Sequence, residues 1–309
     1  MDYQFKKFYR DLYLRTGYIP TKPIDVILHL GDFFQISNGS IVVLGNIFQN
    51  KVIQAEDLDI KFRTSLAENQ WQISSGVQKV YSGRGVGENP IEGEFNFSRQ
   101  IYKFDKEGSF MFHGKNPESA SIVNWNHIQN ELIVKLTQTL FSFRDIYVVF
   151  DVASLSNWTL AVSDNDGELE LATEEENFGL SDIFGHSSTR TVQSKNLHYH
   201  HRADKRRPNF FKAKKLTEND DRMETFMTQI MANETVRRNW AKSYFEDSDY
   251  DLEDTSSSVY LNNKQGLSSI EMLQINELNP NTVLNYYKWS NANLDDIERL
   301  FLSYENMKE

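Results

Sequence analysis

Residues 145–163 read DIYVVFDVASLSNWTLAVS, and this stretch decides the class of fold. It holds two long apolar runs rich in valine and aromatic residues, which are enriched in β-strands. The polar pair Ser156-Asn157 separates the runs and predicts a bend between two strands. Strands this apolar have to be covered by other elements, so we expect the flanking segments to supply further strands and helices.

A helix is predicted directly before these strands. From Asn124 to Leu140 apolar residues recur every four positions, which gives one continuous apolar face. Asn124 or Asn126 suits its N-cap, because a side-chain oxygen accepts hydrogen bonds from free backbone N–H groups there. After the strands, three further strand-like segments follow: GELELAT at 167–173, TRTVQSKNLHYHH at 189–201 and PNFFKAKKL at 208–216.

The N-terminal side adds a helix and a hairpin. Residues 2–15 carry apolar side chains at helical spacing, and Gly17 and Pro20 end the pattern. The pair Asn38-Gly39 between alternating apolar runs predicts a β-hairpin, because both turn positions need positive φ. SGRGVGENP at 82–90 is interpreted as a mobile loop between strands. We therefore predict an α+β fold, a twisted and mainly antiparallel sheet with segregated helices.

Charge divides the chain into two parts. Residues 1–215 hold 25 Lys+Arg and 26 Asp+Glu, a net of −1, whereas residues 216–309 hold 8 and 18, a net of −10. We expect an α+β body over 1–216 and an acidic, mainly helical C-terminal segment over 217–309, with a flexible linker over 246–258. Such a segment is an internal mask, a partner-binding tail or an aid to solubility.

Within this segment, a helix is predicted over 218–245 and short helices over 268–308. Just before the segment lies a basic run, which consists of Arg202, Lys205, Arg206, Arg207, Lys212, Lys214 and Lys215. This run suits anionic lipid or the chain's own acidic part, or it is a solvated strand edge that prevents edge pairing. Nucleic-acid binders usually have a basic domain, and the net charge of −11 argues against that class.

Composition excludes several kinds of chemistry. The chain has no cysteine, which rules out disulfides, thiolate catalysis and cysteine-ligated zinc. Its first residues are charged and lack the apolar run of a signal peptide, and no stretch approaches the ~18 apolar residues of a membrane-spanning helix. We therefore expect a cytoplasmic protein.

No motif predicts an enzyme, a metal site or a cofactor. His198, His200 and His201 lie together, but no further ligand has recognisable spacing, and a polar strand end is the favoured interpretation. Gly83, Gly85 and the residues around them lack the helix and the Lys-Ser/Thr pair of a phosphate loop. We expect no catalytic residues, no metal and no cofactor.

The order of features resembles the bacterial branch of the gasdermin family, which forms membrane pores in cell death. FYRDLYLRTGYIPTKPIDVILHLGDFF at 8–34 and IVVLGNIF at 41–48 resemble that family's opening helix, strand and Leu-Gly hairpin. The helix at 124–142 with the strands after it, and RRPNFFKAKKL at 206–216, resemble its central and closing elements. The resemblance covers residues 5–216. Family members with a short inhibitory end differ from this chain, which continues well beyond residue 216.

The resemblance implies a body that its C-terminal segment holds inactive, a cut by an activating protease, binding to anionic membrane lipids and self-oligomerisation. The stretches 72–93 and 164–189 would lengthen into membrane hairpins that close into a ring. The implied membrane contacts are the cations of the first helix and of the basic run, namely Lys6, Lys7, Arg10, Arg202, Lys205, Arg206 and Arg207.

Two stretches are candidates for the cut, because proteases need exposed, extended segments. Lys214–Arg222 offers Lys215 and Arg222 to a trypsin-like enzyme. Glu246–Ser258, with Asp247, Asp249 and Asp251, is longer and is preferred for accessibility. The competing hypothesis is a non-enzymatic interaction protein, in which the acidic segment binds a protein partner and the body is a scaffold.

Overall fold

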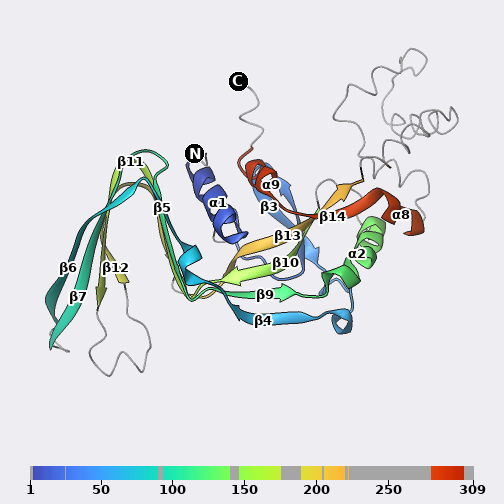
Figure 1. Cartoon of the computed structure of the whole chain (residues 1–309), viewed down its shortest axis with the longest axis horizontal. Helices are drawn as coiled ribbons and strands as arrows, with labels where there is room; N and C mark the ends of the chain where they lie inside the picture. Colours follow the sequence, from blue (N-terminus) through green and yellow to red (C-terminus); the bar gives the residue numbers. More distant parts are fainter. Residues whose placement is uncertain are drawn as a thin grey trace, which may run out of the picture.

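A computed structural model describes residues 3–24, 26–89, 93–139, 146–174, 189–203, 205–219, 222 and 280–302. Within them, two antiparallel sheets lie side by side and carry helices on their faces (Figure 1). The predicted α+β class is confirmed, although the strands divide between two sheets. No helix in these ranges is both long and apolar enough to cross a bilayer.

Sheet A is built around the apolar strand β10 (Tyr147–Ser154). One edge of β10 pairs with β13 (Pro208–Glu218), which in turn pairs with β1 (Ile19–Pro20) and β14 (Tyr287–Asn291). The other edge pairs with β2 (Asp32–Ser37) and β9 (Glu118–Ile122), which are followed outward by β3 (Ser40–Asn46) and β4 (Ile60–Ser65).

Sheet B is built around β11 (Asn157–Glu174). One edge of β11 pairs with β12 (Thr189–Ala203), and the other pairs first with β8 (Phe110–Lys115) and then with β7 (Gly93–Phe104). The outer strands are β5 (Gln72–Ser75) on β8 and β6 (Val77–Asn89) on β7. The interpretation of 82–90 as a mobile loop is wrong up to Asn89, because these residues belong to β6 and pair with β7.

The bend predicted at Ser156-Asn157 carries the chain from one sheet to the other. Strand β10 ends in sheet A and β11 begins in sheet B, with the buried side chain of Leu155 between them. The backbone N–H of Ser156 donates to the carbonyl of Lys115 at 3.0 Å, an ordinary hydrogen-bond distance. This bond ties the crossing to sheet B. The two apolar runs of the sequence are therefore the central strands of two sheets.

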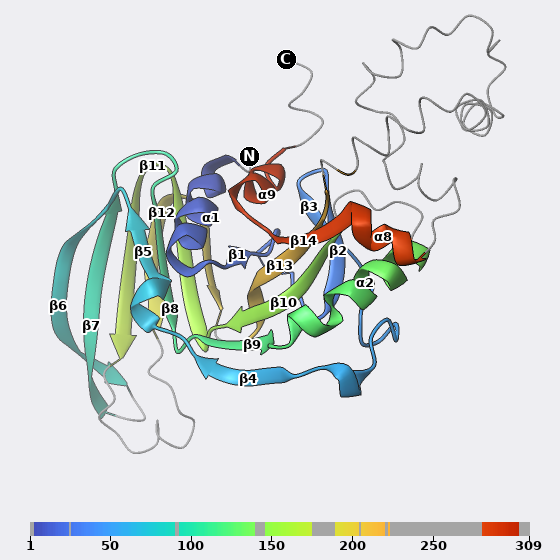
Figure 2. The same ribbon diagram turned by 45° about the vertical axis from the view of Figure 1, so that its right-hand side comes forward.

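Four α-helices and two short 3₁₀ helices complete the described fold. Helix α1 (Tyr3–Thr16) and helix α9 (Leu294–Arg299) lie side by side, whereas α2 (Trp125–Thr139) and α8 (Pro280–Tyr286) pack together at the far end of sheet A (Figure 2). The 3₁₀ helices span Ala55–Asp57 and Glu68–Trp71. The helices predicted at 2–15 and 124–140 are thus confirmed as α1 and α2.

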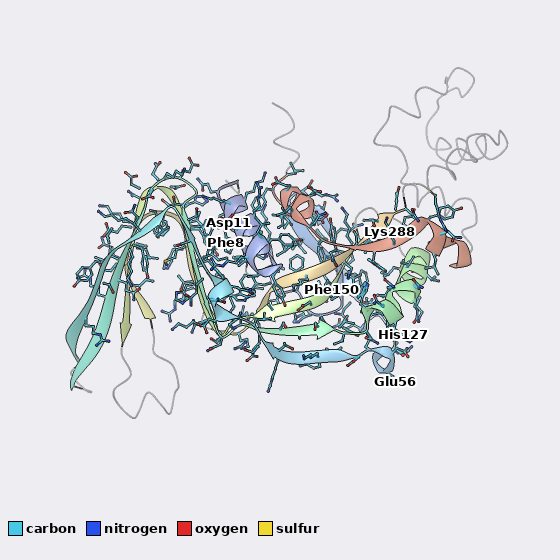
Figure 3. The ribbon with its side chains drawn as sticks, viewed as in Figure 1. Phe8, Asp11, Glu56, His127, Phe150 and Lys288 are labelled. Carbon is cyan, nitrogen blue, oxygen red and sulfur yellow. The ribbon has the colours of Figure 1, made fainter. Side chains whose placement is uncertain are left out.

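The largest hydrophobic cluster lies between the two sheets and α1. Phe8 is on the side of α1 that faces sheet B, and its ring packs against Phe110 and Phe112 at centroid distances of 5.5 and 5.2 Å (Figure 3). A second cluster joins sheet A to α2, α8 and β14. Both clusters contain residues from 280–302, so this part of the C-terminal segment shares its core with the body.

The predicted hairpin turn at Asn38-Gly39 is confirmed. It joins β2 to β3, with φ of 50° at Asn38 and 71° at Gly39. A Cβ on Gly39 would lie 2.9 Å from the carbonyl oxygen of Leu300, at the end of α9. The turn therefore needs glycine both for its backbone conformation and for the close approach of the C-terminal segment.

Gly39→Ala is expected to lower the free energy of unfolding by about 2 kcal/mol, because it combines left-handed strain with a backbone clash. Gly108→Ala is the matched control: its φ is also 71°, but its added Cβ meets only the Gln4 carbonyl at 3.9 Å. Urea unfolding should show a clearly larger loss for Gly39→Ala. Equal losses would mean that the contact with α9 contributes nothing.

Candidate functional site

Helix α9 begins at a reciprocal cap that its sequence encodes. The Asn293 side chain accepts hydrogen bonds from the backbone N–H groups of Asp295 at 2.8 Å and Asp296 at 3.4 Å. In return the Asp296 carboxylate accepts from the Asn293 N–H at 2.8 Å. This capping box satisfies backbone donors that a helix of 6 residues would otherwise leave free. The pattern Asn-x-x-Asp at 293–296 is a sequence signal that our prediction of this region did not use.

Asp296 also anchors α9 to sheet A. Its side chain is 3% exposed, and its carboxylate accepts from the Tyr147 hydroxyl at 2.6 Å and from the Lys215 ammonium at 3.0 Å. Arg299 donates to the Tyr147 oxygen at 3.4 Å. Burial, and then the negative charge of Asp296, raise the pKa of Tyr13 on the neighbouring helix α1. A buried carboxylate is stable here because it has both a cation and hydrogen-bond donors.

The apolar side of α9 inserts between α1 and the β2–β3 turn. Ile297, Leu300 and Phe301 are buried in the largest cluster, and the Phe301 ring meets Tyr9 of α1 edge-on at 5.1 Å. Lys22 donates to the Leu300 carbonyl and lies 4.3 Å from the centre of the Phe301 ring. The apolar residues at this end of the C-terminal segment are therefore covered by α1 and by the main core.

The polar side of α9 meets the cations of α1. Glu298 forms ion pairs with Lys6 and with Arg10, the latter at 3.8 Å. The Lys6 side chain is only 19% exposed, whereas that of Arg10 is 50% exposed. The third predicted membrane cation on this helix, Lys7, donates to the Ser75 hydroxyl at 2.6 Å. Two of the three predicted membrane cations on α1 therefore face an acidic side chain of the C-terminal segment.

Helix α8 and strand β14 attach the C-terminal segment to the body at a second place, beside β13 and α2. Strand β14 pairs with the last five residues of β13, Lys214–Glu218. The Trp289 ring lies edge-on to Trp125 of α2 at 5.5 Å, and its indole N–H donates to the Gln129 carbonyl at 2.9 Å. The sequence predicted only helices over 268–308. Strand β14 was missed because five residues with polar alternation form a strand only when an open edge such as that of β13 is available.

The basic run is dispersed in the structure. Arg206 forms an ion pair with Glu118 at 3.3 Å and donates to the carbonyls of Ser154 and Asn116, which ties it to the start of β9 and the end of β10. Lys205 and Arg207 beside it are exposed. Arg202 is half-buried on β12, opposite Thr159. The predicted membrane cations therefore form two groups, one on α1 and one between β12 and β13.

The two stretches considered for the cut differ in what the structure says of them. Lys214, Lys215 and Leu216 are paired on both sides, with β10 or Ile146 on one side and with β14 on the other, and Lys215 is bound to Asp296. Thr217 and Glu218 pair with β14. Arg222 donates to Asn285 at 2.8 Å. A protease would have to separate these residues from α8 and β14 before cutting. Asp247, Asp249 and Asp251 lie outside the described residues, and their stretch stays a prediction.

Two of the three histidines on β12 contact side chains of β11. His198 lies 3.1 Å from the Asp164 carboxylate, and His201 packs on Trp158 at 4.9 Å. Burial, followed by the nearby charges of His201 and Arg202, lowers the pKa of His200. Across the described ranges, no group of three or more His, Asp or Glu could hold a metal ion.

These elements define a two-sheet α+β protein in which helix α9 of the C-terminal segment packs against the first helix. No family model matches the chain, and no curated protein matches it. Among solved structures, it is similar to the gasdermin A3 membrane pore, with 10% identity, a TM-score of 0.31 and coverage of 69% of this chain and 90% of that chain.

It is also similar to a bacterial gasdermin from Bradyrhizobium tropiciagri, with 10% identity, a TM-score of 0.28 and coverage of 68% of this chain and 86% of that chain. Both structures bear the name of the family that the sequence resembles.

Proposed function

We propose that this chain is a gasdermin-like pore-forming effector, which its C-terminal segment keeps inactive until a protease separates the two. The sequence resemblance supplies the class of activity. The observation that carries the proposal is the position of α9, where Glu298 neutralises Lys6 and Arg10 while Leu300 and Phe301 fill the core beside α1. One short helix thus covers both the charged and the apolar side of α1.

Removal of α9 would give α1 the properties of a membrane-surface helix. Lys6 and Arg10 would lose their ion pairs with Glu298. A cation near an anionic bilayer contributes about 1 kcal/mol of attraction. The apolar surface that now meets Ile297, Leu300 and Phe301 would become available to lipid. Loss of α9 would therefore increase both the electrostatic and the apolar contribution to the membrane affinity of α1.

Four strands of sheet B are long enough to cross a bilayer, which supports the proposal. Strands β6, β7, β11 and β12 contain 13, 12, 18 and 15 residues. A strand that crosses the hydrocarbon core needs about 9–11 residues. The stretches 72–93 and 164–189 were expected to lengthen into hairpins. Of their described residues, 72–75, 77–89, 93, 164–174 and 189 already belong to strands. In the proposed pore, the two long hairpins would enter the bilayer without first having to form their backbone pairing.

Charge reversal at Glu298 tests the mask without cutting the chain. Glu298→Lys should make the intact protein bind vesicles of mixed anionic and neutral lipid more tightly, by up to about 30-fold for two freed cations. Asp295→Lys, an identical charge change at an exposed position of the same helix, is the control. Co-sedimentation that rises equally for both variants would contradict the masking role of Glu298. Vesicle leakage before and after a cut within residues 246–258 tests the proposed function as a whole.

A further inference from the structure

Sheet B is irregular at one level along each of its four strand paths, which are β5–β6, β7–β8, β11 and β12. Gly76, with φ of 65°, separates β5 from β6, and residues 105–109 separate β8 from β7. The register between β11 and β12 shifts between Ser163 and Glu168 of β11. On the β12 side of this shift lies Asn196, which has no β11 partner in the register and a φ of 52°. We call this level the bend line; it comprises Gly76, residues 105–109, residues 163–167 and Asn196.

The bend line divides sheet B into two halves. Both views show the sheet arching over at this level, so that β6, β7 and the far part of β12 descend away from the body (Figures 1 and 2). The apolar cluster on this sheet has buried residues from both halves: Phe104 and Leu169 beyond the bend line, Met111 and Ala161 before it. It is far smaller than the two clusters that hold the body together.

The interruptions are joined by backbone bonds, not by side-chain packing alone. Asp105 N–H donates to the Gly76 carbonyl at 2.9 Å, and Gly108 N–H donates to the Ser163 carbonyl at 2.9 Å. A Cβ on Gly76 would lie 2.3 Å from the Ser109 hydroxyl oxygen. The strands therefore change direction together at one place, which is the arrangement expected of a hinge between two halves.

The N-terminal turns of α1 reach every strand path at the bend line. Lys7 donates to the hydroxyl of Ser75, the residue before Gly76. The Gln4 amide nitrogen donates to the carboxylate of Glu107, between β7 and β8, at 2.9 Å.

The same Gln4 nitrogen donates to the Asp164 carboxylate on β11 at 3.1 Å. Phe5 packs edge-on against His198 and Tyr199 of β12, at 5.8 and 5.1 Å. One helix end thus touches all four strand paths of sheet B, each within a few residues of the interruption in that path.

We propose that the bend line is a hinge and that Gln4, Phe5 and Lys7 are its brace, which holds the far half of sheet B in the arched position. Residues 4–7 lie on the same helix as Tyr9 and Arg10, which contact α9. The brace therefore connects the C-terminal segment to the long hairpins through one rigid element. This inference deepens the proposed function. The hinge and its brace rest on the contacts between α1 and sheet B, and only the role of α9 in releasing the brace rests on the proposed function.

The hinge can be measured on the intact chain because it has no cysteine of its own. Ser65→Cys on β4 and Ser82→Cys on β6 place spin labels at exposed positions of the body and of the far half. Ser82 is six residues past Gly76, about 20 Å at roughly 3.3 Å per residue, so a rotation of about 30° moves it by about 10 Å. Pulsed electron paramagnetic resonance should give one narrow distance for the otherwise unchanged chain.

Gln4→Glu places a third carboxylate against Glu107 and Asp164, and Lys7→Met removes the bond to Ser75. Each should broaden the distance distribution and shift it by up to about 10 Å, while Gln70→Glu, the same change at an exposed position, leaves it narrow. Phe5→Ala serves as a further brace variant if one of these fails to fold, as judged by near-ultraviolet circular dichroism.

Narrow, unshifted distances in folded brace variants would overturn the proposal, as would equal broadening in Gln70→Glu. The measurement needs no membrane and no cut. A hinge that opens in a chain that never permeabilises vesicles would therefore leave this inference intact and defeat the proposed function.

Discussion

Cutting the chain within residues 246–258 is expected to turn an inert protein into one that empties anionic vesicles. The full chain, with a specific protease site placed in this stretch, should cause leakage near background, and the cut chain should release most of the trapped dye. The physical reason is that the cut removes the tether that holds α9 at high local concentration beside α1.

Residues 280–302 remain in the core after such a cut, because Ile297, Leu300 and Phe301 are buried and β14 is paired with β13. Release is therefore a dissociation, and leakage should begin after a lag that shortens as the protein is diluted before vesicles are added. Lys6→Gln with Arg10→Gln in the cut chain should reduce leakage, and vesicles of neutral lipid should remain closed. Equal leakage before and after complete cutting would contradict the proposed function.

Asp296→Ala is expected to cause the largest loss of stability among single changes in the C-terminal segment, about 3 kcal/mol. The substitution removes the buried carboxylate that accepts from the Lys215 ammonium and the Tyr147 hydroxyl, and it also removes half of the capping box at Asn293. Asp296→Asn should cost less, because an amide oxygen still accepts hydrogen bonds.

The matched control is Asp295→Ala, next in sequence but exposed, which should change the free energy of unfolding by less than about 0.5 kcal/mol. Chemical denaturation followed by tryptophan fluorescence measures all three variants, since Trp289 and Trp125 report on this region. If Asp296→Ala and Asp295→Ala unfold at the same denaturant concentration, the buried carboxylate does not hold α9 in place.

Elements with local causes were predictable. Helices α1 and α2 follow from apolar residues at helical spacing, and the β2–β3 hairpin follows from Asn38-Gly39, because only a few residue types adopt positive φ in sequence. The strand β6 was not predictable, because SGRGVGENP has three glycines and gains its strand conformation from pairing with β7. The bend at Ser156-Asn157 was predictable as a bend, but not as a crossing between sheets.

The sequence by itself determined that this chain has an acidic end, a near-neutral body, no cysteine and a cationic first helix. Charge and composition are sums over residues and need no coordinates. Only the tertiary structure decided that Glu298 meets Lys6 and Arg10, that Asp296 is buried against Lys215, and that Gln4 reaches two carboxylates of sheet B. Such pairs depend on how sheets and helices stack over long separations in sequence, and no local pattern carries that information.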